Sequence, residues 1–191
     1  MTTTETTNIA HTGLPAGRWA IDPSHSEVGF SVRHLGLSKV RGHFKSFTGS
    51  VTASTQLSDA KVEATVDLSS VDTNNEQRDG HLLSADFFDV DNNATMTFNS
   101  TAIAVDSGES SGTITGELTI AGVSKPVHLD AEFNGVAVDA YGTTRAGFSA
   151  AATVSRKDFG IDFNVPLDAG GILIGDKVTI ELEIQLVPTE G

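Results

Sequence analysis

Residues 142–156 read Gly-Thr-Thr-Arg-Ala-Gly-Phe-Ser-Ala-Ala-Ala-Thr-Val-Ser-Arg, with apolar side chains at every second position of the central part. This alternation is typical of a β-strand with one buried face. The buried positions would be Ala146, Phe148, Ala150, Ala152 and Val154. The stretch exceeds the mean strand length of about five to six residues, which favours a barrel wall over a small sandwich. Because most of these side chains are small, and because a barrel of about eight strands lies between a filled core and a ligand cavity, we expect a β-barrel with space inside.

Further segments with a period of two predict the other strands. They lie at residues 19–21, 26–34, 40–53, 61–68, 96–104, 114–120, 127–133 and 178–186. Short turns join most of them, so the sequence predicts an all-β, antiparallel meander of roughly eight strands.

Two of these segments carry a more specific expectation. In residues 40–53, Phe44 and Phe47 are out of phase, which suggests a β-bulge that re-aims the strand. In residues 96–104, several apolar side chains have the same period-two phase, so they should lie on one face of the strand. These are Met96, Phe98, Ala102 and Ala104.

Residues 73–88 interrupt the strand pattern. Thr73-Asn-Asn-Glu76 matches a capping box, whose first and fourth side chains satisfy free amide groups at the start of a helix. We expect one short helix across Gln77–Leu83, with an apolar side that covers one mouth of the barrel. That side contains Leu82, Leu83, Phe87 and Phe88.

Length and composition limit the function classes. The 191 residues fit one domain over residues 17–191, preceded by a flexible tail at residues 1–16. A net charge of −13 argues against nucleic acid and against anionic membrane surfaces as partners. The sequence has no cysteine and no apolar run of transmembrane length. Because the tail does not resemble a signal peptide, we expect a soluble, cytoplasmic protein.

Metal-binding and catalytic patterns do not stand out. His25, His34 and His43 are nine residues apart, a spacing that fits one face of neither a strand nor a helix, so we expect no metal site. Residues 89–100 resemble the start of a calcium loop but lack its glycine and its bidentate glutamate. Without a nucleophile motif, a phosphate-binding loop or a recognisable carboxylate pair, we expect no enzyme activity and no cofactor.

Arg156 continues the inward phase of residues 146–154, which puts it at one end of the barrel. Lys157 and Arg78 add positive charge to an otherwise acidic chain. A basic side chain at a barrel mouth could hold an anionic head group such as a phosphate. The alternative is a structural ion pair with one of the many carboxylates.

Several motifs, in matching order over residues 17–187, resemble those of the YceI-like polyisoprenoid-binding family. The first is Trp19-Ala-Ile-Asp-Pro-Ser-His-Ser-Glu-Val-Gly-Phe-Ser-Val-Arg-His34. Next come Gly42-His-Phe44, Val71-Asp-Thr73, Arg78-Asp-Gly-His-Leu82 and Asp86-Phe-Phe88. The last are Gly116-Glu-Leu-Thr-Ile-Ala-Gly-Val-Ser-Lys-Pro-Val127 and Ser155-Arg-Lys-Asp-Phe-Gly-Ile161.

The resemblance implies a lipocalin-like antiparallel barrel with an elongated apolar cavity, to which the sequence adds the short helix near the mouth. It implies non-enzymatic binding, sequestration or transport of a long-chain amphiphile. Candidates for this ligand are an isoprenoid quinone, a polyprenyl phosphate or a fatty amide. A homodimer is also implied. Many relatives carry a secretion signal, and we expect none in this sequence.

The candidate ligand-binding residues fall into two groups. Those expected to line the lumen are Phe30, Val32, Phe44, Leu82, Phe87, Phe98, Leu118, Phe133, Phe148, Ala150 and Ile180. Those expected to hold the head group near the mouth are His25, His34, Arg78, His81 and Arg156.

Two other function classes stay open at this point. An enzyme that acts on a lipid head group would need two or more titratable groups together inside the cavity. A protein-interaction module would have a filled barrel and an apolar patch on its outer face.

Overall fold

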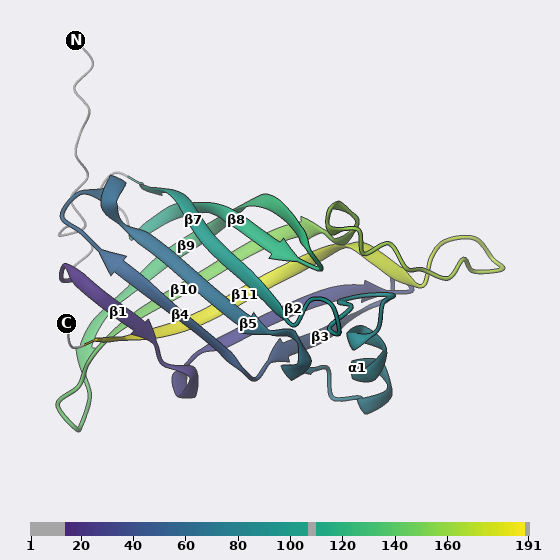
Figure 1. Ribbon diagram of the computed structural model, residues 1–191, viewed down its shortest axis with the longest axis horizontal. Coiled ribbons are helices and arrows are strands. Elements are labelled where there is room, and N and C mark those ends of the chain that lie inside the picture. The colour runs from purple at the N-terminus through teal and green to yellow at the C-terminus, as the bar shows by residue number, and fades with distance from the viewer. Residues whose placement is uncertain (1–13, 107–109, 190–191) are drawn as a thin grey trace, which may run out of the picture.

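The computed structural model describes residues 14–106 and 110–189, which form an elongated antiparallel β-barrel with one α-helix at one end (Figure 1). The strands are β1 (Gly17–Ile21), β2 (Glu27–His34), β3 (Ser38–Phe44), β4 (Phe47–Ala53), β5 (Lys61–Asp67), β6 (Val71–Asp72), β7 (Thr95–Val105), β8 (Ser111–Ile120), β9 (Val123–Val138), β10 (Thr144–Ser155) and β11 (Ile174–Pro188). The helices are α1 (Glu76–Leu83) and the short 3-10 turns η2 (Pro23–His25), η3 (Leu57–Asp59), η4 (Leu68–Ser70) and η5 (Arg156–Phe159). None of these described helices is long and apolar enough to span a membrane.

Three walls of the barrel are kinked strands. β11 pairs with β2 along most of its length and with β1 near its end, so β1 and β2 are two halves of one wall. β4 and β3 pair with these halves in turn, and β5 and β6 pair with β4 and β3. The barrel therefore has eight walls in a closed antiparallel meander, as the sequence predicts. They are the kinked walls β1–β2, β3–β4 and β5–β6 and the single strands β7, β8, β9, β10 and β11.

The segment at residues 40–53 is not one bulged strand, as the sequence suggested, but two strands with a corner between them. The backbone amide of Lys45 donates to the carbonyl of Ser70 at 3.1 Å, and that of Ser46 donates to the Ser70 hydroxyl at 3.0 Å. The corner lets both Phe44 and Phe47 point inward although they are three residues apart, and both are buried.

A β-bulge does occur in β7, where the register with β8 shifts between Ser100 and Ala102. One extra residue moves every later side chain to the other face of a strand. Met96 and Phe98 therefore face inward, whereas Ala102 and Ala104 are exposed. The expectation that these four side chains share one face is wrong for this reason.

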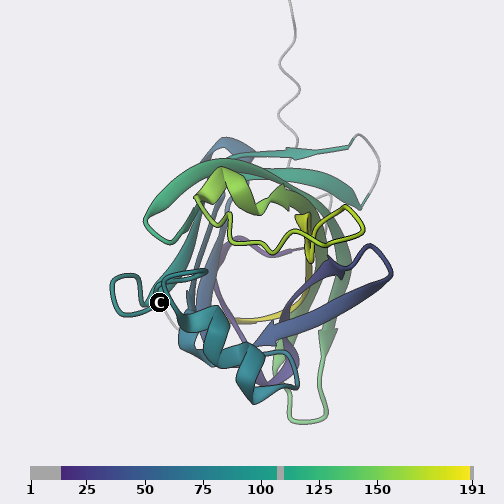
Figure 2. The same ribbon diagram turned by 90° about the vertical axis from the view of Figure 1, so that its right-hand side faces the viewer.

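One end of the barrel carries α1, the β2–β3 hairpin and residues 160–173, which lie around that end of the wall in Figure 2. We call it the mouth end, and the opposite end, with the β9–β10 hairpin, the far end. The prediction of a short helix at a mouth is confirmed, but its cap is Asn75 rather than Thr73. The Asn75 side chain accepts from the amide of Arg78 at 2.9 Å, while Thr73 donates to Asp79.

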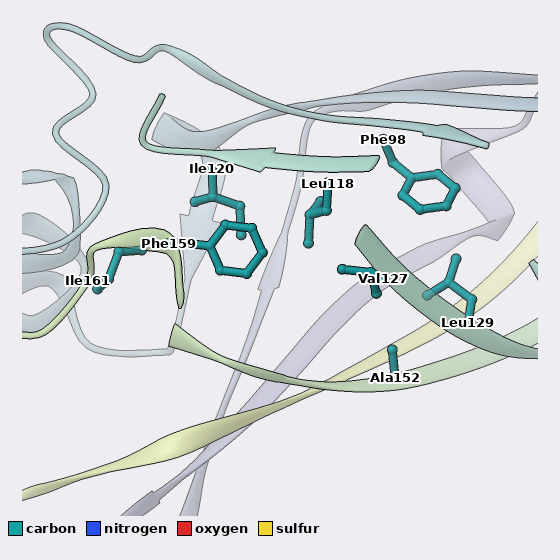
Figure 3. Close-up of a cluster of buried hydrophobic side chains, with 8 residues drawn as sticks. All are labelled: Phe98, Leu118, Ile120, Val127, Leu129, Ala152, Phe159 and Ile161. Atoms are coloured by element: carbon teal, nitrogen blue, oxygen red, sulfur yellow. The ribbon is translucent and has the colours of Figure 1, made fainter. Parts of the chain in front are cut away.

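Buried apolar side chains form three clusters, one of which contains Phe44, Phe47 and Leu68 beside the corner. The far end is closed by Leu14, Trp19, Ala53, Ala146 and Leu186. Because Leu14 is buried, the packed chain already includes part of the tail predicted over residues 1–16, of which residues 1–13 lie outside the described chain. The third cluster lies on the β7–β10 side, where side chains from four strands and from η5 point toward one another (Figure 3). It contains Phe98, Leu118, Ile120, Val127, Leu129, Ala152, Phe159 and Ile161.

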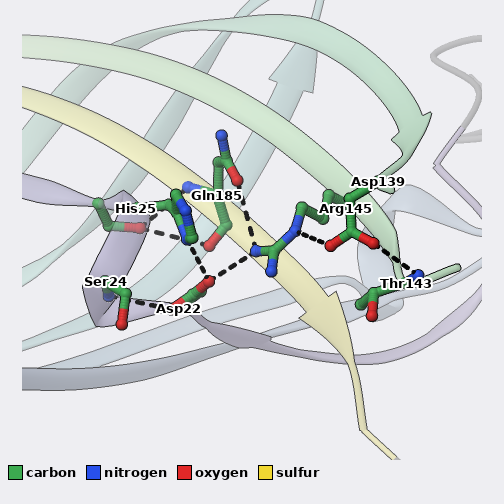
Figure 4. A network of polar contacts seen from close by, with 8 residues as sticks. Asp22, Ser24, His25, Asp139, Thr143, Arg145 and Gln185 are labelled. Carbon is green, nitrogen blue, oxygen red and sulfur yellow. Dashed lines mark hydrogen bonds and ion pairs between the residues drawn. The ribbon is translucent and has the colours of Figure 1, made fainter. Parts of the chain in front are cut away.

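A polar network outside the barrel fixes the kink between β1 and β2 (Figure 4). Arg145 on β10 binds Asp22 in the kink at 2.6 Å and Asp139 in the β9–β10 hairpin at 2.8 Å. His25 binds the same Asp22 carboxylate at 2.8 Å. The hydrogen bond from Arg145, and then that from His25, lowers the pKa of Asp22 from 3.8 to about 2. The network therefore stabilises the fold only while Asp22 is ionised.

This network predicts a pH-dependent contribution to stability. A lowered pKa in the folded state adds stability above pH 4 that disappears as the pH falls toward 2. We expect Asp22→Asn to lose about 1 kcal/mol of unfolding free energy at pH 7, since solvent screens the pair, and to approach the wild type near pH 2. Urea denaturation across this pH range measures the difference. Asp130→Asn, an exposed carboxylate outside the network, is the control, and an equal loss in it would contradict the assignment.

Candidate functional site

A cavity of about 1010 Å³ runs through the barrel lumen. Its size lies at the upper end of the roughly 300–1,000 Å³ typical of small-molecule pockets. Inward side chains from all eight walls contribute to its surface, and nearly all of them are apolar. The barrel is therefore not filled by its own side chains, and the filled-barrel alternative is wrong.

The size of the cavity excludes a simple packing defect. At about 24 cal/mol per Å³, a defect of 1010 Å³ in a closed core would cost on the order of 24 kcal/mol. Whole domains are stable by only about 5–15 kcal/mol. The lumen is therefore no defect in a closed core, and the hydrogen-bonded wall surrounds it.

All but one of the predicted ligand-binding positions within the barrel line this cavity. They are Phe30, Val32, His34, Phe44, Arg78, His81, Leu82, Phe87, Phe98, Leu118, Phe148, Ala150, Arg156 and Ile180. Whether they touch a ligand stays a prediction.

Phe133 is the exception and does not line the cavity. The register between β9 and β10 shifts beside Phe148, and the Phe133 ring packs on Phe148 with centroids 4.9 Å apart. This pair belongs to the apolar cluster that closes the far end. His25, predicted near the mouth, lies instead in the outer network with Asp22.

The ionisable side chains that line the cavity are all arginines and histidines, although the chain has 25 Asp and Glu residues and only 12 Lys and Arg residues. They are Arg33, His34, Arg78, His81 and Arg156. Across residues 14–106 and 110–189, no carboxylate contributes to the lining. All five belong to the mouth end, because they lie at the tip of β2, on α1 and at the end of β10. The cavity is thus an apolar tube with a basic rim.

Arg156 is the most buried of these groups, with 5% of its surface exposed. Its Nε donates to the carbonyl of Gly175 at 2.9 Å, and its Nη2 donates to that of Ile174 at 3.3 Å. Its Nη1 donates to the carbonyls of Ile161 and Phe163 at 2.9 and 2.8 Å. The side chain therefore holds the segment that follows β10 against the start of β11.

The carbonyls that bind Arg156 satisfy its N–H groups without neutralising its charge. Burial lowers the pKa of the guanidinium below its usual value, because loss of water penalises the charged form. Among the described residues no carboxylate forms an ion pair with it, so the predicted structural ion pair is wrong. The predicted contact with an anionic head group stays a prediction.

Arg78 is oriented by its neighbours on the other side of the mouth. Its Nε and Nη2 donate to the hydroxyl and carbonyl oxygens of Thr73, both at 2.7 Å. The Thr73 hydroxyl in turn donates to Asp79 at 2.5 Å. These bonds leave Nη1 of Arg78 without a hydrogen-bond partner in the described chain. Thr73 lines the cavity, which the sequence analysis did not predict because it interpreted Thr73 as part of a capping box.

His81 lies between two aromatic rings at the mouth. The Phe87 and Phe163 rings meet it edge-on, with centroids 5.0 and 4.9 Å away. Its Nε2 is 2.8 Å from the Asp86 carboxylate, which fixes the orientation of the imidazole. Phe163 was missed from the sequence because the loop after η5 has no strand period. Its position depends on contacts with Arg156, His81 and Phe87.

Within the described ranges, no group of three or more His, Cys, Asp or Glu side chains could hold a metal ion. His34 lines the cavity, whereas His25 lies outside it and His43 pairs in register with Asp72 on the neighbouring strand.

Comparison with known proteins gives a consistent family. The family model of the YceI-like domain matches residues 19–186. A UPF0312 protein of Staphylococcus epidermidis is 37% identical over 166 residues, which cover 86% of this chain and 94% of that protein. A UPF0312 protein of Pseudomonas aeruginosa is 44% identical over 142 residues, which cover 74% of this chain and 73% of that protein.

Solved structures share the fold. The YCEI protein of Campylobacter jejuni matches with a TM-score of 0.68 and 33% identity, covering 88% of this chain and 96% of that chain. Burkholderia cenocepacia BcnA has a TM-score of 0.72 and 23% identity, covering 86% and 98%. A polyisoprenoid binding domain from Saccharophagus degradans has a TM-score of 0.69 and 13% identity, covering 90% and 98%. At identities below 25%, the last two likenesses concern the fold alone.

The role of Arg156 predicts a large loss of stability when it is removed. Arg156→Met keeps the apolar stem but leaves four backbone carbonyls without their donor. We expect the unfolding free energy to fall by about 3 kcal/mol, because hydrogen bonds to charged groups contribute about 1.5–3 kcal/mol each and are not additive. Urea denaturation measures the loss, and Lys157→Met, at the exposed neighbour, is the control. Equal stability of the two variants would mean that Arg156 does not hold the loop.

Proposed function

Because the chain belongs to the YceI-like family and encloses an apolar cavity with a basic rim, we propose that it binds a long-chain amphiphilic lipid. The apolar chain would occupy the lumen, and the polar head group would lie at the mouth end. The observation that carries this proposal is the separation of the two kinds of lining within one cavity of about 1010 Å³.

The apolar part of the lining supplies the affinity. Burying a methylene group contributes about 0.8 kcal/mol, or roughly a fourfold gain in affinity for each group that leaves water. Affinity should therefore rise with chain length until the lumen is full. Branched isoprenoid chains suit a lumen that is walled by aliphatic and aromatic side chains.

The basic rim favours a head group that accepts hydrogen bonds. Arg78 offers Nη1, and Arg156 contributes a charge that no contacting carboxylate cancels. A phosphate gains most from such groups, while a quinone or an amide gains from their N–H donors alone. A cationic amphiphile is disfavoured, because like charges at the rim would repel it.

The comparisons support this proposal less directly than the cavity does. The Saccharophagus degradans protein of the same fold is a polyisoprenoid binding domain, but at 13% identity that likeness concerns the fold. The more similar UPF0312 proteins bear names that state no ligand. The geometry of this chain therefore supplies the argument for a lipid.

His81 and Asp86 favour a second candidate, an enzyme that acts on the lipid head group. A histidine hydrogen-bonded to a carboxylate at 2.8 Å can act as a general base or acid. Both candidates need the same cavity, so the chemical state of the bound lipid separates them. A lipid recovered unchanged after long incubation supports binding, and a modified head group supports catalysis.

The first test is to purify the protein from its native host without detergent, extract it with organic solvent and analyse the extract by mass spectrometry. We expect a stoichiometric lipid with a long apolar chain, because such a chain best fills the lumen. An empty protein that also fails to take up polyprenyl phosphate, quinone or fatty amide would overturn the proposed function.

A cavity-filling variant tests where the chain lies. Ala150 lines the cavity on β10 beside Ala131 and Leu182, so Ala150→Phe should put a ring into the lumen. We expect at least a tenfold loss of affinity for a long isoprenoid, measured by titration, with the fold kept. Ala151→Phe, at the exposed next position, is the matched control and should bind normally. Normal binding by Ala150→Phe would place the chain elsewhere.

A further inference from the structure

An apolar ridge projects beside the mouth. It is formed by the β2–β3 hairpin tip and by the loop at residues 163–173, which extends beyond the barrel (Figure 1). The Leu35 amide on the tip donates to the carbonyl of Leu173 in the loop at 2.9 Å, so the two parts form one surface. The exposed large apolar side chains of the ridge are Leu35, Leu37, Val165 and Ile172. Leu37 is 79% exposed, which is unusual for a leucine in an ordered turn.

The backbone of the hairpin tip indicates that leucine serves a purpose at position 35. The amide of Leu37 donates to the carbonyl of His34 at 3.0 Å and closes a β-turn, whose central residues Leu35 and Gly36 have φ values of 55° and 69°. Such turns strongly prefer asparagine or glycine at the first position, and a bulky side chain there is strained. Because Leu35 is also 39% exposed, contacts within the chain do not explain this choice.

The charges behind the tip give a second sign of an outside partner. Arg33 and Lys39 are directly opposite each other across β2 and β3, and both are exposed. Like charges at such a pair destabilise a sheet. In the described chain, neither side chain forms an ion pair. Two positive charges are thus kept together behind two exposed leucines in a protein of net charge −13.

We propose that this ridge docks on the surface of a phospholipid bilayer. Leu35 and Leu37 would enter the boundary between head groups and acyl chains, while Arg33 and Lys39 would bind lipid phosphates. Exposed apolar side chains next to basic ones are typical of segments that lie in this interface. The proposal goes beyond ligand binding, because the ridge is an outer surface and needs no ligand to act.

Position and charge both favour a bilayer over a protein partner. The ridge adjoins the cavity, because His34, Val165 and Leu173 belong to the cavity lining as well. A docked barrel would therefore turn its mouth toward the membrane. The net charge of −13 means that lipid phosphates would repel the other faces of the protein. Salt screening at physiological ionic strength limits this repulsion to about 8–10 Å. The loop segment 163–173 adds only one carboxylate, Asp168.

Flotation with phosphatidylcholine vesicles tests the proposal, because their surface has no net charge. We expect the wild-type protein to float with the vesicles and the double variant Leu35→Asn, Leu37→Ser to lose at least nine tenths of the floated fraction. Asparagine suits the left-handed turn, so the melting temperature of the double variant should be equal to or above that of the wild type. Tyr141→Ser, at the far-end hairpin where Tyr141 is 94% exposed, is the matched control and should float normally.

A charge variant tests the phosphate contact separately. Lys39→Glu replaces a repulsive cross-strand pair with an attractive one, so it should not weaken the fold. It should reduce flotation several-fold, and added salt should reduce wild-type flotation toward the same level.

Several results would overturn the proposal. These are a wild-type protein that does not float, a double variant that floats normally, and a control that loses binding to the same extent. A change from dimer to monomer in the double variant, measured by light scattering, would assign the ridge to a second copy of this chain instead. Each variant should still take up a long-chain lipid from solution, so a failure of the ridge is distinguishable from a failure of the cavity.

Discussion

β11 pairs with β10 along one edge, while its other edge pairs first with β2 and then with β1. One strand thus serves two partners, and the sheet closes only because the chain kinks between them at residues 22–26. In the described sheet β6 keeps an open edge, and α1 packs beside it, as helices often cover exposed edges. Since this closed ladder fixes the wall, the lumen does not need side chains to hold its shape.

Because hydrogen bonds between the strands hold the wall, the inward side chains do not need to fill the lumen. The inward positions of the strands are apolar along the tube, whereas basic groups occur at the mouth end alone. Arg145 performs a different task on the outer face, where it ties Asp22 in the kink to Asp139 in a distant hairpin. The basic groups on the two faces therefore separate into those that secure the wall and those that face the cavity.

Strand alternation explains how much of this could be predicted from the sequence. A period of two identified most wall strands and most lining positions, including Phe30, Phe98 and Ala150, because each follows its strand without interruption. The prediction failed at Ala102, where one extra residue in β7 shifts the register, and at Phe133, which keeps the phase of Ala131 but packs in the far-end cluster. No local pattern marks the bulge in β7, since its pairing with β8 determines it. Phe163 was missed because the loop after η5 has no strand period, and Arg156, seven residues earlier, holds that loop.

Arg156 links the cavity rim to the outer ridge. On the rim side, its guanidinium binds the carbonyl of Phe163, whose ring faces His81. On the ridge side, it binds the carbonyl of Ile174, and the neighbouring carbonyl of Leu173 accepts a hydrogen bond from Leu35. A carboxylate partner would satisfy the same N–H groups, but it would cancel the charge and repel a phosphate at the rim. Carbonyls satisfy the donors and leave the positive charge in place. Backbone ligation of Arg156 therefore holds the loop without a carboxylate paired to the guanidinium in the described chain.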